Sequence, residues 1–320
     1  MSLISPMFGN KARAALCGTL LLAAIGVGTP AQAQGLRAKL AERAQATAAP
    51  LPPGVQKIAD VPYGPDARQR MDIYLPSSSA PNPSGMRTPV IFMVHGGGWR
   101  NGDKAMGRVV DNKVARWVPR GLIFVSVNYR LLPDTPVAQQ AQDVAQALAT
   151  AQQQAAQWGG DAGRFILMGH SAGAHLVSLI NAQPALAQRL GAWPWLGAVS
   201  LDSAMLNVPQ FMRAPHLPLY DDAFGTNPVY WHAMSPFHQW VSGAPPYQFV
   251  CSTERPDQPC LQAQAMARHV HTQGGRAEVL PQPLTHGEVN AELGLDSDYT
   301  RAVEGFMASL DAVVAQKLGR

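Results

Sequence analysis

Residues 165–180 read FILMGHSAGAHLVSLI, an apolar run that passes through Gly-His-Ser-Ala-Gly into a helical pattern. The residues before Gly169 predict a buried strand, and the apolar spacing after Gly173 favours a helix. A strand that turns sharply into a helix at Gly-x-Ser-x-Gly exposes the serine hydroxyl at the turn. Ser171 is therefore the candidate nucleophile, and its small neighbours let the backbone segments approach closely.

Similar apolar runs alternate with helical patterns along the rest of the chain. We expect further strands at 89–95, 122–129, 196–201, 247–251 and 277–280, and helices at 104–118, 137–157, 172–183, 261–273 and 299–317. Two short alternating runs before residue 77 predict a hairpin at the sheet edge. Continuous apolar runs are typical of strands covered by helices on both faces. The pattern predicts a doubly wound, mostly parallel α/β sheet.

One segment, 203–240, breaks this alternation. It is rich in Pro, Met, His and aromatic residues and has no clear period. We interpret it as a cap-like insertion over the C-terminal edge of the sheet, within one domain that spans 55–320. Met205, Phe211, Met212, Trp231 and Phe237 could line a substrate pocket there, or could equally pack in the core.

A glycine-rich segment follows the expected strand at 89–95. It reads His95-Gly96-Gly97-Gly98-Trp99, and consecutive glycines leave backbone N–H groups accessible because no Cβ covers them. Such donors can stabilise the negative charge of a tetrahedral intermediate. The amides of Gly97, Gly98 and Ala172 are the candidate oxyanion hole.

Nine histidines are present, and the base that activates Ser171 must be chosen among them. His286 lies in PLTHGEVN, just after the last expected strand, where loops form the ligand-binding edge of open α/β sheets. His170 adjoins Ser171 but must point away from the turn. His269 and His271 are two residues apart on an expected helix, so they face different sides. We therefore choose His286 as the base.

An acid that orients the base is expected between residues 172 and 285, because triads of this kind run Ser, Asp or Glu, His along the chain. Glu254 and Asp257 follow the strand-like run YQFVC, and Asp202 follows LGAVSL. We choose Asp257 as the acid, with Glu254 as the first alternative and Asp202 as the second.

The N-terminus has the pattern of a secretory signal. Lys11 and Arg13 precede an apolar run at 14–28, and Ala31-Gln32-Ala33 forms a small-x-small cleavage site. We expect residues 1–33 to be a signal peptide, 34–54 a flexible tether, and the protein to be periplasmic or secreted. Cys251 and Cys260 would then lie where disulfides persist, and could form a bridge or remain free thiols.

Composition excludes several classes of protein. The sequence is 47% hydrophobic and 14% charged, with a formal net charge of +4, which disfavours disorder and a nucleic-acid partner. No apolar run is long enough for a membrane span, so we expect no stable membrane insertion. Phosphate-binding and metal-binding motifs are missing, so we expect neither cofactor nor metal.

Four segments together resemble the α/β-hydrolase-fold esterases: HGGGWRNGDK (95–104), VNYRL (127–131), GGDAGRFILMGHSAGAHL (159–176) and THGEVN (285–290). The branch they resemble includes hormone-sensitive-lipase-related, feruloyl-esterase-like and arylformamidase enzymes. The resemblance covers roughly residues 55–315 and implies an eight-stranded, mostly parallel sheet, a Ser-His-Asp triad and no cofactor. The acid-bearing loop departs from the family's HG-x-x-D pattern, because residues 251–260 read CSTERPDQPC.

The sequence thus predicts a serine esterase that cleaves a small-molecule carboxylic ester through an acyl-enzyme on Ser171. An arylformamidase-type amidase needs the same triad and stays an alternative. A non-catalytic binding protein on the same scaffold is a third hypothesis. The oligomeric state is left open.

Overall fold

The computed structural model describes residues 50–77 and 87–320. The expected signal peptide at 1–33 and most of the expected tether at 34–54 lie outside the described residues. Among the described helices, none has the length and apolar character needed to cross a membrane.

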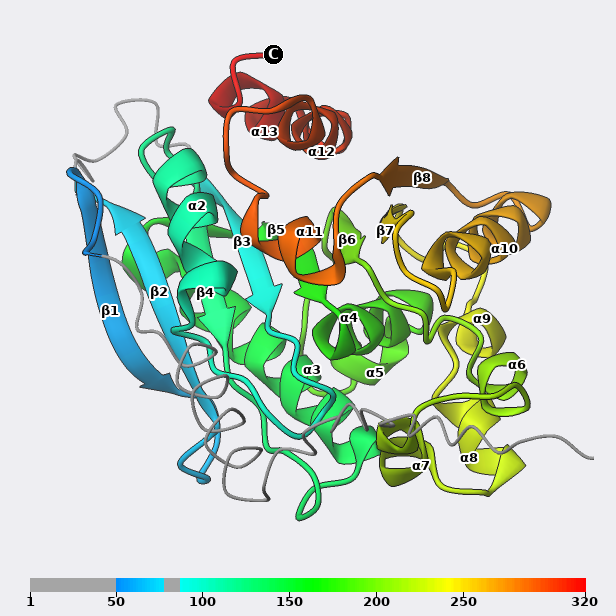
Figure 1. Cartoon of the computed structure of the whole chain (residues 1–320). Helices are drawn as coiled ribbons and strands as arrows, with labels where there is room; N and C mark the ends of the chain where they lie inside the picture. The colour runs from blue at the N-terminus through cyan, green and yellow to red at the C-terminus, as the bar shows by residue number, and fades with distance from the viewer. Residues whose placement is uncertain (1–49, 78–86) are drawn as a thin grey trace, which may run out of the picture. The chain divides into compact units, whose positions relative to one another are not determined.

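In this described part, an eight-stranded sheet has the order β1-β2-β4-β3-β5-β6-β7-β8 (Figure 1). The strands are β1 (Val55–Pro62), β2 (Arg70–Pro76), β3 (Thr88–Val94), β4 (Ile123–Val127), β5 (Gly160–His170), β6 (Gly197–Leu201), β7 (Tyr247–Ser252) and β8 (Ala277–Gln282). β1 pairs with β2, and β2 with β4, in antiparallel fashion, and the other neighbours are parallel. The expected mostly parallel sheet with an edge hairpin is confirmed.

Alternating residues of the central strands enter two separate apolar cores. In β3, Phe92 belongs to one core while Ile91 and Met93 belong to the other, and all three are fully buried. Neighbouring side chains of a strand point to opposite faces, so a sheet covered on both faces needs an unbroken apolar run. This is the physical reason why the strands could be read from the sequence.

The helices divide between these faces (Figure 1). α2 (Gly107–Trp117) and α12 (Asp298–Ala308) contribute to the core that contains Ile91, whereas α3 (Val137–Gln154), α4 (Ala172–Ala182) and α10 (Pro259–Thr272) contribute to the core that contains Phe92. The other elements are a 3-10 turn η1 (Ala155–Trp158) and the short helices α5 (Ala185–Gln188), α11 (His286–Ala291) and α13 (Ala312–Lys317).

The segment 203–240 forms the short helices α6 (Val208–Met212), α7 (Pro218–Phe224), α8 (Pro228–Ala233) and α9 (Pro236–Gln239) between β6 and β7. Each of them has a proline in its first turn. Proline suits this position because its φ is already helical and its missing N–H is not needed there. Because a proline favours the start of each of these helices, the segment forms short helices although its apolar residues show no long helical periodicity.

Candidate active site

Ser171 stands at the junction of β5 and α4 in a strained backbone conformation, with φ 56° and ψ −118°. Positive φ is uncommon for any residue other than glycine. The neighbouring glycines make the turn possible, because a Cβ at Gly169 would collide with the carbonyl of Gly173, and one at Gly173 with the carbonyl of Val94. The sharp turn expected from Gly-His-Ser-Ala-Gly is therefore present.

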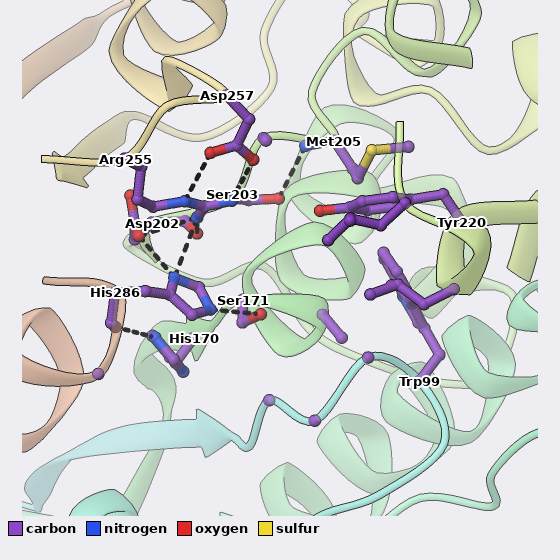
Figure 2. Close-up of a pocket in the computed structure, with 18 of the residues that line it drawn as sticks. Trp99, His170, Ser171, Asp202, Ser203, Met205, Tyr220, Arg255, Asp257 and His286 are labelled. Carbon is purple, nitrogen blue, oxygen red and sulfur yellow. Dashed lines mark hydrogen bonds and ion pairs between the residues drawn. The ribbon is translucent and has the colours of Figure 1, made fainter. Parts of the chain in front are cut away.

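His286 lies against Ser171, and Asp202 lies on the other side of its imidazole (Figure 2). The distance from His286 Nε2 to Ser171 Oγ is 2.9 Å, and that from His286 Nδ1 to Asp202 Oδ2 is 2.6 Å. A neutral imidazole in this arrangement accepts the serine proton at Nε2 and donates Nδ1–H to the carboxylate. The three side chains form one continuous line of hydrogen bonds.

The position of His286 is fixed by the start of α11. Thr285 caps this helix in a capping box with Glu288. From α2, the Asn112 side-chain amide donates to the carbonyl of Ala291 at 2.6 Å, and Lys113 Nζ donates to the carbonyl of Asn290 at 2.5 Å. Because both ends of α11 are held, its first residue has a defined place beside Ser171.

Asp202 follows β6 directly, and its side chain is fully buried. Besides His286 it binds the amide of Ser252 at 2.8 Å and Arg255 Nη1 at 2.9 Å. Burial alone would raise the pKa of Asp202, but the His286 hydrogen bond, the Arg255 charge and the Ser252 amide together hold the pKa below its ordinary value. The carboxylate is therefore ionised beside the imidazole.

The choice of Asp257 as the acid is wrong. Its carboxylate binds Arg255, with Nε to Oδ1 at 2.9 Å and a second contact from Nη2 to Oδ2, and Arg255 lies between Asp257 and His286 (Figure 2). No contact joins the Glu254 carboxylate to His286 in the described part of the chain, so the first alternative fails as well. The second alternative, Asp202, is the carboxylate that reaches the imidazole.

The sequence did carry signals for Asp202. It comes immediately after a fully buried parallel strand, and the register pairs Leu201 of β6 with Val250 of β7. A carboxylate at that point starts at the ligand-binding edge of the sheet. The arginine two residues before Asp257 also offers that carboxylate a local partner, which competes with a distant histidine.

The glycine-rich loop after β3 adopts conformations that favour glycine. Gly97 has φ 127° and Gly98 φ 60°, and a Cβ at Gly97 would collide with the carbonyl of Asn101. The loop closes through the amides of Arg100 and Asn101, which donate to the carbonyl of Gly97 at 3.2 and 2.9 Å.

The three expected oxyanion donors lie around one cavity, together with Ser171. Within the described residues, the backbone amides of Gly97, Gly98 and Ala172 make no hydrogen bond to another protein group. Donors that are held in place and have no protein acceptor are suited to an oxyanion.

This cavity has a volume of about 850 Å³ and a largely apolar wall. Trp99 and insertion residues provide that wall: Met205, Phe211, Leu217, Leu219 and Tyr220. Of the residues expected to line it, Met205 and Phe211 do so. The others, Met212, Trp231 and Phe237, pack against the core instead. Leu217 and Leu219 were missed because an irregular segment gives no period from which to predict exposure.

Two further side chains, those of His170 and Arg255, lie beside the imidazole of His286. His170 does point away from Ser171, and its Nε2–H donates to the backbone carbonyl of His286 at 2.8 Å. Burial, and then the nearby imidazole of His286, hold the pKa of His170 well below its usual value, so His170 is neutral. Arg255 is not among the residues expected from the sequence, although it contacts both Asp202 and His286.

Cys251 and Cys260 are bonded to each other, with their Cα atoms 5.1 Å apart. The bridge joins the end of β7 to the start of α10 and closes the loop that carries Arg255. Across residues 50–77 and 87–320, no three His, Cys, Asp or Glu side chains gather in a way that could hold a metal ion.

The sequence of this chain is similar to those of known esterases. The BD-FAE family model matches residues 71–192. Carboxylesterase NlhH of Mycobacterium tuberculosis is 30% identical over 236 residues, which cover 64% of this chain and 68% of that protein. Esterase LipQ of the same species is 31% identical over 231 residues, or 68% of this chain, and the chain spans only about half (53%) of its length.

The fold is shared with solved esterase structures. Esterase B from Lactobacillus rhamnosis matches with a TM-score of 0.67 and 21% identity, over 90% of this chain and 95% of that one. The eight-stranded sheet is therefore the α/β-hydrolase fold.

Proposed function

The chain belongs to the carboxylesterase family of the α/β-hydrolase fold, and from this premise we propose that it is a serine hydrolase that cleaves small-molecule carboxylic esters. The observation that carries the proposal is the line of hydrogen bonds from Ser171 through His286 to Asp202, at 2.9 and 2.6 Å. It opens into a cavity with an apolar wall.

In the proposed reaction, Ser171 Oγ attacks the ester carbonyl carbon while His286 Nε2 takes the hydroxyl proton. The imidazolium then gives this proton to the departing alcohol, and an acyl-enzyme remains on Ser171. Water attacks the acyl group in the second half, with His286 again as the base. Asp202 keeps Nδ1–H directed toward itself and stabilises the imidazolium.

Gly97, Gly98 and Ala172 are proposed to bind the oxyanion. Their amides have no acceptor among the residues that the structure describes, and they line the cavity next to Ser171. One such donor contributes about 3 kcal/mol to transition-state stabilisation. Because the glycine loop is closed by its own hydrogen bonds, the amides need little reorganisation during the reaction.

Labelling with a fluorophosphonate probe tests the proposal. Wild-type protein should be labelled and should hydrolyse p-nitrophenyl acetate, whereas Ser171→Ala should do neither. Ser309→Ala is the matched control, because Ser309 is an exposed serine at the C-terminal end of α12 and does not line the cavity. Equal labelling of wild type and Ser171→Ala would refute the proposal, and no labelling of either would favour a binding protein. A higher rate on N-formylkynurenine than on the ester would replace ester hydrolysis by the amidase alternative.

We also propose that residues 1–33 direct export to the periplasm or the medium and that the mature chain begins at Gln34. Lys11 and Arg13, the apolar run 14–28 and the Ala31-Gln32-Ala33 site support this, and a disulfide at Cys251 and Cys260 suits an oxidising compartment. The intact mass of exported protein from a bacterial host tests it, since a retained residue 1 would contradict the proposal.

A further inference from the structure

Arg255 is the one charged side chain that touches both proposed helpers of Ser171 within the described residues. Its Nη1 lies 2.9 Å from Asp202 Oδ2, 3.0 Å from the Asp202 carbonyl oxygen and 3.0 Å from His286 Nδ1. The first two contacts fix the carboxylate relative to its own backbone. The third brings a positive charge beside the imidazole.

The opposite side of the guanidinium is held by Asp257. Nε contacts Asp257 Oδ1 at 2.9 Å, and Nη2 contacts Oδ2. Two parallel bonds of this kind between an arginine and a carboxylate define the plane of the guanidinium. Asp257, which does not reach His286, thus sets the orientation of the group that does.

The loop that carries this pair is closed at its base. Cys251 and Cys260 bond to each other, and Ser252 Oγ donates to the carbonyl of Leu284 at 2.6 Å, two residues before His286. The side chain of Arg255 is 14% exposed. A charged group that is this enclosed and contacts two carboxylates has little freedom to turn away.

We propose that Arg255 is a positioning residue that holds the Asp202 carboxylate in line with His286 and, through its charge, disfavours protonation of the imidazole. The inference rests on the proposed hydrolase function and assigns a role within that site. Bringing a positive charge close to a forming imidazolium opposes its protonation, whereas the Asp202 carboxylate favours it. The charges of Arg255 and Asp202 thus act on the imidazole in opposite directions, while Asp202 still orients it.

Other ionisable groups near this line are His170 from β5, Lys113 from α2, Tyr220 from α7 and Tyr299 from α12. Burial lowers the pKa of His170 and raises the pKa of Tyr220 and Tyr299, so these three are neutral. Burial also lowers the pKa of Lys113 to about 7. Lys113 is present in every variant below, so its titration affects all of them alike.

The experiment measures kcat/KM for p-nitrophenyl acetate against pH in Arg255→Met, Arg255→Lys and Asp257→Asn. Arg301 provides matched controls, because it also bridges two carboxylates, Asp296 and Asp298, on an exposed surface. Arg301→Met and Asp298→Asn are therefore measured beside them. Circular dichroism and thermal melting verify that each variant is folded. The imidazole NMR signal of His286, assigned with His286→Gln, reports its protonation independently of activity.

Arg255→Met should move the acid limb of the pH profile and the His286 NMR titration to higher pH and lower kcat by about tenfold or more. Asp257→Asn should move both to lower pH, because it leaves the guanidinium charge less compensated. Arg255→Lys keeps the charge but not the planar fork, so it should restore the acid limb and not kcat. The Arg301 and Asp298 variants should match wild type.

Unchanged acid limbs in folded Arg255→Met and Asp257→Asn would overturn the inference, as would shifts in the same direction. If Arg255→Met does not fold, its shift cannot be compared with the opposite shift of Asp257→Asn, and the shift of Asp257→Asn then decides, with the unshifted acid limb of Arg255→Lys beside it. Failure of fluorophosphonate labelling in wild type would instead refute the hydrolase function, and the NMR titrations would still decide whether Arg255 controls His286.

Discussion

Asp202 and Asp257 both bind the guanidinium of Arg255, but only Asp202 contacts His286. The two acids are the same residue type and differ in position: Asp202 touches the imidazole, whereas Arg255 lies between Asp257 and the imidazole. An acid that touches the imidazole fixes its tautomer and stabilises its charged form, whereas an acid one group further away acts only through Arg255.

Replacement of each aspartate by asparagine should therefore distinguish the roles of the two acids. Asp202→Asn should lower kcat by on the order of 10⁴, the loss known for the same change in a serine protease triad. Asp257→Asn should retain activity at neutral pH within about tenfold. Rates on p-nitrophenyl acetate give the comparison, and a larger loss for Asp257→Asn than for Asp202→Asn would contradict the arrangement.

The same pair of acids explains how far the sequence could predict the site. Ser171 and the glycine loop belong to local motifs, in which neighbouring residues determine the backbone geometry. His286 could be found because it follows the last strand. The acid could not be chosen in this way, since Asp202, Glu254 and Asp257 all follow strands that end at one edge. Which carboxylate reaches His286 depends on how the loops pack in the folded chain. Arg255 lies between Asp257 and the imidazole, so Asp257 does not reach it.

At the scale of the elements, α2 and α12 are joined by one buried carboxylate. Glu304 Oε1 accepts from Arg116 Nε at 2.9 Å, Trp117 Nε1 at 3.0 Å and Arg120 Nη1 at 3.1 Å. Burial alone would raise the pKa of Glu304, but the bonds from Arg116 and Trp117 and the arginine charges hold it below its ordinary 4.5. The ionised form therefore stabilises the contact between the two helices.

Glu304→Gln should destabilise the protein by about 2 kcal/mol at pH 7, because it leaves buried donors with a neutral acceptor. A carboxyl group with a lowered pKa in the folded state stabilises above the pKa of the unfolded chain, and this gain is lost as the pH falls through the folded value. The difference in melting temperature between wild type and variant should thus close below about pH 4.5. Glu278→Gln, at an exposed pair with Arg276, is the control that should differ little at either pH.

Element boundaries show a second limit of sequence reasoning. The continuous helical pattern expected at 299–317 is two helices, because the Asp311 side chain accepts from the amides of Val313 and Val314 and begins α13. Aspartate competes with helical hydrogen bonds in this way wherever the backbone can bend. The strands were predictable because short unbroken apolar runs suit strands of a sheet that is covered on both faces.

For the molecule as a whole, the Cys251–Cys260 bridge connects the sheet to α10 and encloses Arg255. Closure of a loop between two cysteines that are nine positions apart stabilises by roughly 2–3 kcal/mol in the chain-entropy model. Reduction should therefore lower the melting temperature by several degrees. A Cys251→Ser/Cys260→Ser double variant should melt at the lower temperature with or without reductant. Unchanged melting of wild type after complete reduction, verified by thiol titration, would contradict the prediction.

Asp202 is followed directly by Ser203, the first residue of the insertion that supplies most of the apolar wall. The segment returns to the sheet in β7, whose end leads into the loop of Arg255. A chimera that replaced this segment with one from another hydrolase would be spliced at the acid on one side and, on the other, just ahead of the strand whose far end leads to the arginine. Grafting whole caps would therefore disturb proton transfer together with selectivity, whereas point changes at Phe211 or Leu219 would alter selectivity alone.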